Sequence, residues 1–192
     1  MSQIQVIKRD GSKEPLDLDK LHTVVNYACQ DITGVSASEV EIRSHLQFYD
    51  GIKSVDIQET IIKSTADLIS EETPGYQYVA GRLINYHVRK QVYNAFTPWP
   101  LYKLVARNVD IGMYDPALLT DWSEEEWNQL DGYIKHERDE TLTYAGMEQF
   151  RGKYLVQNRV TKEIYETPQM AYMCIAVTLF GGYPKETRMK WV

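Results

Sequence analysis

The sequence predicts a mainly α-helical protein in which a β-hairpin caps a four-helix bundle and a second, mostly helical domain with a small β-hairpin follows. Two observations favour this fold class. Apolar residues recur at helical spacing through most of the 192 residues, whereas strand-like alternation is confined to the N-terminal 18 residues and to residues 153–167. The rigid segment Thr97-Pro98-Trp99-Pro100 then breaks the helical pattern, so we expect two domains, at residues 1–96 and 97–192.

The first element is the predicted hairpin. Apolar and polar residues alternate in 4–8 and again in 13–18, which is typical of strands with one buried face. Asp10-Gly11 between them is a strong turn signal, because glycine tolerates the positive φ that tight turns need. Proline cannot donate a ladder hydrogen bond, so Pro15 indicates that the second strand lies at an edge of the sheet.

Four helices are expected after the hairpin. The first carries an apolar stripe from Leu21 to Ile32 and is expected to stop at Gly34. The second follows overlapping capping-box patterns that begin at Ser36 and Ser38, and it runs to about Tyr49.

The third and fourth helices complete the predicted bundle. Ser54 or Asp56 can cap the third helix, which ends before the break at Thr73-Pro74-Gly75. The fourth helix runs from about Tyr76 to Phe96.

The second domain begins with a helix from Leu101 to about Gly112. Ser123 then opens a helix with a capping box, and the acidic residues that follow suit the positive end of the helix dipole. The remaining expected elements are a helix at 138–150, strands at 153–157 and 163–167, an apolar helix at 170–180 and a helical pattern at 185–192.

Composition and charge disfavour several classes of protein. Hydrophobic residues make up 43% and charged residues 25%, which are ordinary globular values, so disorder is disfavoured. The first 96 residues hold 10 basic and 13 acidic residues and the last 96 hold 11 and 14, so each half carries −3 of the net charge of −6. Neither half is a basic arm, so nucleic-acid binding is not expected.

The cysteine count and the length of the apolar runs indicate the cellular compartment. Cys29 and Cys174 are too few for a disulfide framework or a four-ligand zinc site, and each lies on an apolar helical stripe. The N-terminus has no apolar signal core, and no apolar run approaches the ~18 residues of a membrane helix. We therefore expect a cytoplasmic protein that binds neither membranes nor a resident metal.

The usual nucleotide and catalytic motifs are absent from the sequence, including GxxxxGK[ST], GxGxxG, HExxH, CxxC and GxSxG. One constellation still favours a polyphosphate ligand. It combines cations near the hairpin and on the fourth helix with polar residues at the start of the third helix, where backbone N–H groups attract anions. Its members are Lys8, Arg9, Lys20, Ser54, Gln58, His87 and Lys90. The alternative is that these charges are scattered and solvated.

A resemblance to a known family points in the same direction. VIKRDGSKEPLDLDKLH resembles the opening of the ATP-cone domain, and HLQFYDGIKSVDIQETIIKSTADLIS and PGYQYVAGRLINYHVRKQVYNAF resemble its continuation in the large subunit of class I ribonucleotide reductases. HERDETLTYAGMEQFRGKYLVQNRVTKEIYETPQ and YPKETR resemble the helical domain that follows in that subunit. Residues 1–96 are thus expected to be an ATP-cone allosteric domain, and residues 97–192 the N-terminal helical domain.

ATP cones also occur on anaerobic reductases and on a zinc-ribbon repressor. This sequence has no zinc ribbon, and its second half is similar only to the aerobic class I subunit. The resemblance implies that the catalytic barrel and its cysteines are missing here. An expressed fragment, a split gene and a truncated reading frame all remain open as origins of such a chain.

The resemblance also implies contacts to a nucleotide that lies between the hairpin and the bundle. Lys8 and Arg9 match family positions that meet phosphates. Glu14 and Asp17 match partners of the adenine, and Lys20 matches a further phosphate or ribose contact.

The phosphate side of the implied site is completed by Ser54, His87 and Lys90. Asp56 matches a position tied to inhibition by dATP, through an indirect role. Three positions depart from the family pattern, because Ser54 replaces Thr, Asp17 replaces Asn, and Gln58 stands where His is usual.

The implied function is allosteric. ATP, or dATP with the opposite effect, would bind as its magnesium complex and regulate a parent reaction that reduces ribonucleoside diphosphates to deoxyribonucleoside diphosphates. The implied partners are the catalytic barrel of the large subunit and the small, radical-bearing subunit; no catalytic residue, metal ligand or redox cofactor is expected in this chain. Two alternatives remain: a stand-alone nucleotide sensor or small-subunit-binding module, and a structural module whose site has decayed.

Overall fold

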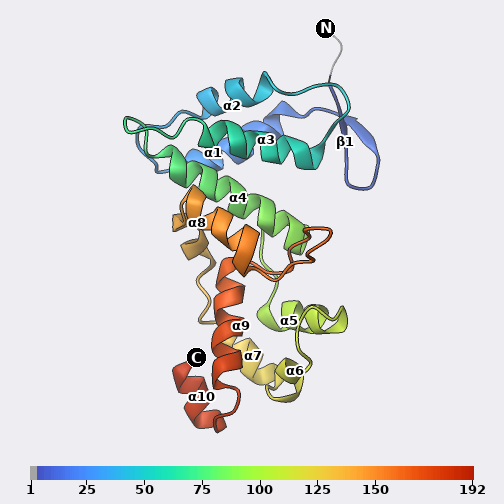
Figure 1. Ribbon diagram of the computed structural model, residues 1–192, viewed down its shortest axis with the longest axis vertical. Helices are drawn as coiled ribbons and strands as arrows, with labels where there is room; N and C mark the ends of the chain where they lie inside the picture. The colour runs from blue at the N-terminus through green and yellow to red at the C-terminus, as the bar shows by residue number, and fades with distance from the viewer. Residues whose placement is uncertain (1–3) are drawn as a thin grey trace. The chain divides into compact units, whose positions relative to one another are not determined.

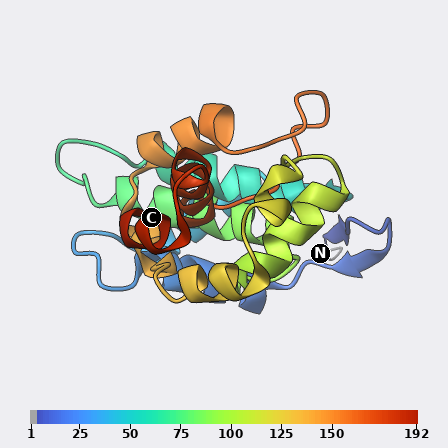
Figure 2. The same ribbon diagram turned by 90° about the horizontal axis from the view of Figure 1, so that it is seen from below.

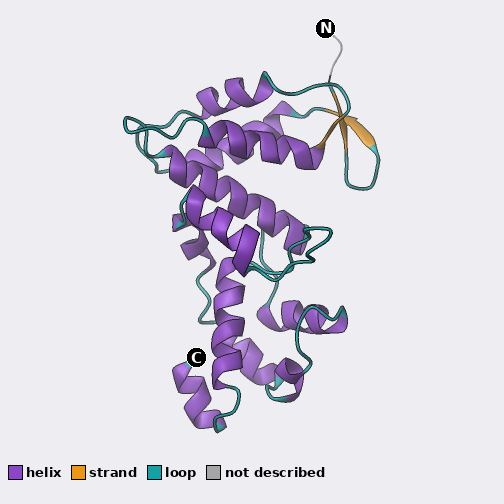
Figure 3. Ribbon diagram, in the orientation of Figure 1, coloured by secondary structure: helices purple, strands orange, loops and turns teal. Residues whose placement is uncertain are grey.

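The computed structural model describes residues 4–192, which fall into two compact units. The first unit comprises residues up to His87 together with Thr141–Met147, and the second comprises Val88–Glu140 and Glu148–Val192. Figure 3 shows helices throughout both units, with strands confined to the N-terminal region. The predicted mainly helical fold class is therefore confirmed.

The sheet of the first unit has the strand order β2-β1-β3. Strands β1 (Gln5–Ile7) and β2 (Lys13–Pro15) form the predicted antiparallel hairpin, and the turn has Gly11 at φ +83°. Pro15 lies on an edge strand, as expected. Strand β3 (Ile52–Lys53), which pairs with β1 in parallel, was not predicted, because two residues are too few to show an alternating pattern.

Helix α1 (Leu18–Cys29) begins at the N-cap Asp17 and buries Leu21, Val25 and Ala28. The predicted stop at Gly34 is wrong. The chain already leaves the helix at Gln30, and Asp31 has a φ of 59°, a left-handed conformation that an aspartate adopts more readily than most residues. Ile32 therefore lies outside the helix.

Helices α2 (Ala37–His45) and α3 (Ser54–Ala66) follow. Ser36 caps α2 as predicted, accepting the Glu39 N–H at 3.3 Å, but the helix ends four residues before Tyr49. For α3 the expected cap at Ser54 or Asp56 is wrong, because the chain enters the helix directly from β3 with extended Lys53 as N-cap.

Helix α4 (Tyr76–Tyr93) is the central helix of the bundle, with Val79, Ala80 and Ile84 fully buried. It ends three residues before the predicted Phe96, at Asn94, whose φ is 54°. Gly81 is required at its position, because a Cβ there would overlap the backbone of Leu142, in the segment 141–147 that packs within the same unit.

The second unit consists of short helices around a core that contains both Trp122 and Trp127, with ring centroids 6.1 Å apart. The capping box of Ser123 and Glu126 is confirmed. The helical elements are α5 (Leu101–Asp110), α6 (Ala117–Thr120), α7 (Glu124–Asp131), the 3-10 helix η1 (His136–Thr141), α8 (Tyr144–Gln149), the π-helix η2 (Phe150–Tyr154), α9 (Pro168–Phe180) and α10 (Lys185–Trp191). Of these, α8 begins in the first unit.

Two predictions for this half are partly wrong. The expected helix at 138–150 is interrupted between η1 and α8, since residues 142 and 143 are not helical. The expected strands at 153–157 and 163–167 reduce to a single bridge between Gln157 and Ile164. The Asn158 side chain accepts from the N–H groups of Val160 and Thr161 and so closes the turn locally, without an extended ladder.

Helix α10 is fixed to α7 by a buried ion pair. Nη2 of Arg188 lies 2.7 Å from Oε1 of Glu126, and the guanidinium is stacked 4.1 Å from the Trp122 ring centroid. Both red helices, α9 and α10, are visible in Figure 2. Across residues 4–192, none of the helices has the length and apolar character needed to cross a bilayer.

Candidate functional site

Strand β3 brings two distant segments of the first unit to one end of the sheet. Strands β1 and β3 are parallel and Ile7 is paired with Lys53, so the next residues along the two strands are Lys8 and Ser54. Ser54 is the first residue of α3, which starts beside the sheet (Figure 1). A predicted phosphate ligand, Lys8, therefore leaves the sheet at the N-terminus of a helix.

Lys8 is paired with Glu14 across the hairpin. Its Nζ lies 2.8 Å from Oε1 of Glu14, with 38% of the lysine side chain and 40% of the glutamate side chain exposed. Arg9, next to Lys8, is exposed at the turn. An ion pair this open to water contributes little to stability, so a phosphate can take the place of the carboxylate at small cost.

Asp17 and Lys20 form a second pair at the start of α1. Oδ1 of Asp17 accepts the Lys20 N–H at 3.0 Å, and Oδ2 lies 3.2 Å from Lys20 Nζ. The backbone hydrogen bond, followed by the Lys20 side chain, lowers the pKa of Asp17, and the Asp17 carboxylate raises the pKa of Lys20. Asp17 thus acts as a helix cap, a role that the sequence analysis had not given it.

The N-terminus of α3 is a suitable place for an anion. The side chain of its N-cap residue Lys53 makes no capping hydrogen bond, and the first N–H groups of a helix attract anions. Ser54 and Gln58 are half-buried one turn apart, while Asp56 is exposed in the first turn. The Asp56 carboxylate competes with an incoming phosphate for the same positive end of the helix dipole.

His87 on α4 faces the same helix. Its side chain is 5% exposed, and Nε2 lies 3.5 Å from Oε1 of Glu59, a residue of α3 that the sequence analysis missed. The pairing of α3 with α4 depends on tertiary packing, and the sequence carries no local signal for it.

Most of the predicted site residues belong to the same unit. All except Lys90 lie in the first unit. Lys90 follows His87 on α4, one helical turn later and within the second unit. Glu14 lies on β2, Asp17 caps α1, and Lys20 lies in the first turn of α1.

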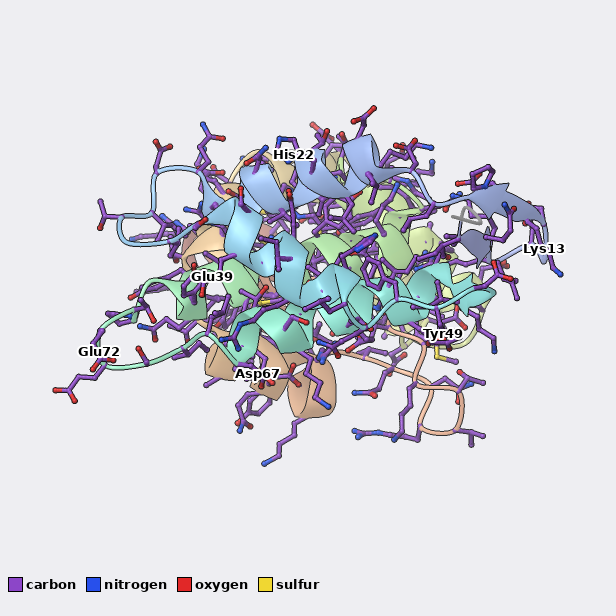
Figure 4. All side chains as sticks on the ribbon, turned by 90° about the horizontal axis from the view of Figure 1, so that it is seen from above. Lys13, His22, Glu39, Tyr49, Asp67 and Glu72 are labelled. Carbon is purple, nitrogen blue, oxygen red and sulfur yellow. The ribbon has the colours of Figure 1, made fainter. Side chains whose placement is uncertain are left out.

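The opposite end of the first unit carries a different feature. Lys13 at the hairpin and Glu72 mark the two ends in Figure 4. Near Glu72, the loops around residues 31–34 and 72–78 enclose a hollow of about 550 Å³. The predicted site residues do not line it, so this hollow is separate from the candidate site.

The cysteines lack the properties of catalytic thiols. Burial raises the pKa of Cys29 to about 11 and that of Cys174 to about 12, so both stay protonated at neutral pH. The Cys174 thiol lies 3.7 Å from the hydroxyl of Tyr114, which donates to buried Glu166. Across residues 4–192, no three His, Cys, Asp or Glu side chains gather to hold a metal ion.

A buried carboxyl group stands out in the second unit. Asp139 on η1 is fully buried, and burial raises its pKa to about 7, although the positive charge of Arg89 pulls the pKa down. Arg89 is itself buried and donates to the carbonyl oxygen of His136 at 2.8 Å. Nearby Glu140 adds a weaker repulsion that also raises the pKa of Asp139.

Comparison with known proteins identifies two matching family models. The family described as "ATP cone domain" matches residues 4–91, and the family described as "Ribonucleotide reductase, all-alpha domain" matches residues 140–192. The chain belongs to the ribonucleotide reductase family. The ATP cone match spans every predicted site residue, from Lys8 to Lys90.

Individual relatives cover the whole chain. The "Ribonucleoside-diphosphate reductase 1 subunit alpha" of Escherichia coli (strain K12) is 54% identical over 187 residues, which are 97% of this chain and 25% of that protein. The corresponding subunit of Haemophilus influenzae is 52% identical over 98% of this chain, and that of Enterobacteria phage T4 is 40% identical over all of it. The chain spans about a quarter of the length of these reductase subunits.

Proposed function

We propose that this chain is the nucleotide-sensing part of a ribonucleoside-diphosphate reductase large subunit, with residues 1–96 as its regulatory domain and residues 97–192 as the helical domain that follows. ATP bound in the ATP cone favours reduction of ribonucleoside diphosphates, and dATP disfavours it. The observation that carries the proposal is the position of Lys8 at the uncapped N-terminus of α3. That geometry supports binding of an anion.

Phosphate binding on this proposal is an exchange of partners. The triphosphate, as its magnesium complex, takes Lys8 from Glu14, and the α3 N–H groups, Ser54 and Gln58 add hydrogen bonds. Glu14 is then released to accept from the adenine amino group. Arg9 and Lys20, both exposed, supply further positive charge from the hairpin and from α1.

Discrimination between ATP and dATP must come from a single 2′-hydroxyl group. A buried polar group left without its partner costs about 1–3 kcal/mol, which matches the usual size of an allosteric coupling energy. His87, Lys90 and Asp56 complete the phosphate side, where Asp56 acts indirectly through the charge at the start of α3.

Calorimetric titration with ATP and dATP tests the proposal. We expect saturable binding of both, and we expect Lys8→Ala and Lys90→Ala to weaken it about tenfold or more, since a charge-assisted phosphate contact is worth roughly 1.5–3 kcal/mol. Lys153→Ala is the matched control, because Lys153 is an exposed lysine on the π-helix η2. Equal losses from all three changes, or no binding at all, would contradict the proposal.

We further propose that the reaction itself belongs to the rest of the large subunit and to the small, radical-bearing subunit, in the cytoplasm. On this view the chain supplies no catalytic residue and no redox cofactor. Its role is to convert the identity of the bound nucleotide into a change of subunit assembly.

A stand-alone module that binds the small subunit is the second candidate, and one surface favours it. Helix α2 and the turn after it expose Ile42, Leu46 and Tyr49, which are 63%, 80% and 59% accessible. Charged neighbours such as Arg43 border this stripe, which suits a reversible protein contact. Pull-down of the small subunit by wild type and by Leu46→Asp, with and without dATP, tests this candidate.

A further inference from the structure

Helix α9 has two apolar sides, and only one of them is buried within the second unit. Its thirteen residues, Pro168–Phe180, include no charged side chain. Met170, Cys174 and Val177 face the core. A helix that is apolar on all sides is normally buried on all sides, so the solvent exposure of the other side of α9 is unusual.

The exposed side forms a continuous stripe, which we call the outer face of α9. Tyr172, Ile175 and Leu179 are 54%, 57% and 69% exposed at helical spacing, and Tyr183, 53% exposed, continues the series beyond the helix. Surfaces of this kind, contiguous and apolar, mark places where another protein segment packs.

The π-helix η2 extends the same surface. The Phe150 ring lies 5.6 Å from that of Tyr172 and 6.0 Å from that of Tyr154, and Tyr154 is 67% exposed. π-Helical turns occur mostly at sites with a special role, and here one places an aromatic pair against the outer face.

The kind of partner follows from the charge pattern. The α2 stripe lies among Glu39, Glu41 and Arg43, as expected of a surface that is exposed to solvent whenever a reversibly bound partner dissociates. Helix α9 itself carries no charge, which is typical of permanent burial, and Arg151 and Lys153 of η2 border its extension through Phe150 and Tyr154. The reductase subunits that match this chain are about four times as long, so most of their mass lies outside the matched region.

We infer that the outer face of α9, extended by Phe150 and Tyr154, is the surface against which the remaining three quarters of the reductase large subunit pack. The inference rests on the proposed function, because that occupant exists only if the chain works as part of such a subunit. The occupant is recognised by its chemistry: an uncharged, apolar surface of the same polypeptide, held without dissociation.

The test compares the same substitutions in two settings. One is the isolated 192-residue chain. The other is a full-length chimera in which this chain replaces the matching 187 residues of the Escherichia coli alpha subunit. The variant is Ile175→Asp with Leu179→Asp, the milder variant is Leu179→Ala, and the matched control is Val160→Asp, at a turn position that is 90% exposed.

We expect the double variant to leave the melting temperature of the isolated chain within about 1 °C of wild type, and to lower that of the chimera by roughly 5 °C or more. Leu179→Ala should also lower the melting temperature of the chimera, and Val160→Asp should change the melting temperature of neither protein. ATP binding by the isolated chain, measured in parallel, reports on the proposed function separately, because the outer face contains none of the predicted nucleotide ligands.

Three results would overturn the inference. An unchanged melting temperature of the chimera carrying the double variant would show that the rest of the subunit does not cover this face. Equal destabilisation of the isolated chain would show that the chain covers the face by itself. A wild-type chain that sediments as a dimer, and becomes monomeric with the double variant, would show that a second copy is the occupant.

Discussion

Replacing Asp139 by asparagine should make the stability of the chain less dependent on pH. Asp139 is fully buried and its pKa is raised to about 7, whereas an unfolded aspartate titrates near 3.8. Between these values the folded protein holds a proton that the unfolded chain has lost. The free energy of unfolding of the wild type must therefore fall as pH rises from about 4 to about 7, and then level off.

The size of the effect follows from the same shift. Each pKa unit corresponds to 1.36 kcal/mol, and about two units separate pH 5 from the folded-state pKa of about 7. The amide of the Asp139→Asn variant cannot ionise, so the difference in unfolding free energy between variant and wild type should move by about 3 kcal/mol in favour of the variant between pH 5 and pH 8. Any part of the substitution's cost that does not depend on pH shifts both ends equally.

Urea unfolding at pH 5, 6, 7 and 8 measures this difference. Asp110→Asn is the matched control, because Asp110 is exposed at the end of α5, and its difference from wild type should stay flat over the same range. If the Asp139→Asn difference is also flat, the carboxyl group does not titrate near neutrality and the argument from burial is refuted.

Three further predictions address the first unit and the activity. Gly81→Ala should destabilise the chain by about 2 kcal/mol in urea unfolding, because the new methyl group overlaps the Leu142 backbone. Gly146→Ala, whose methyl group meets only ordinary contacts, should be neutral or stabilising by up to about 1 kcal/mol. The reverse ranking of the two variants would contradict the close packing of Gly81 against Leu142. Gln58→His, built into a complete large subunit, should tighten dATP binding by about 1 kcal/mol and strengthen inhibition; superimposable inhibition curves at low salt would remove position 58 from the site. The chain mixed with the small subunit alone should not reduce CDP or ADP, and a steady-state turnover assay that detects deoxynucleotide would contradict this.

Local sequence signals predicted the elements that depend on local physics. The hairpin follows from Asp10-Gly11, and the start of α7 follows from the capping box of Ser123. Strand β3 could not be predicted, because its two residues form a strand only through pairing with β1, some 45 residues earlier. The end of α1 was missed because Asp31 already adopts the left-handed conformation (φ 59°), three residues before the more obvious Gly34, whose φ of 74° is also left-handed.

The candidate site divides in the same way. The residue types that suit a phosphate, such as Lys8 and Ser54, could be picked from the sequence and from its resemblance to the ATP cone. Their adjacency could not, because it depends on the parallel register of β3. The partners of Lys8 and His87, which are Glu14 and Glu59, depend on side-chain geometry that no spacing rule provides.

The division of the chain into units has a consequence for protein engineering. The first unit is not a contiguous cassette, since it ends within α4 at His87 and takes up residues 141–147 from later in the sequence. A gene fusion cut after residue 87 would interrupt helix α4 and remove the Leu142 backbone that packs against Gly81. Grafting the first unit onto another enzyme therefore requires an insertion format, in which the host receives both stretches and the chain between them.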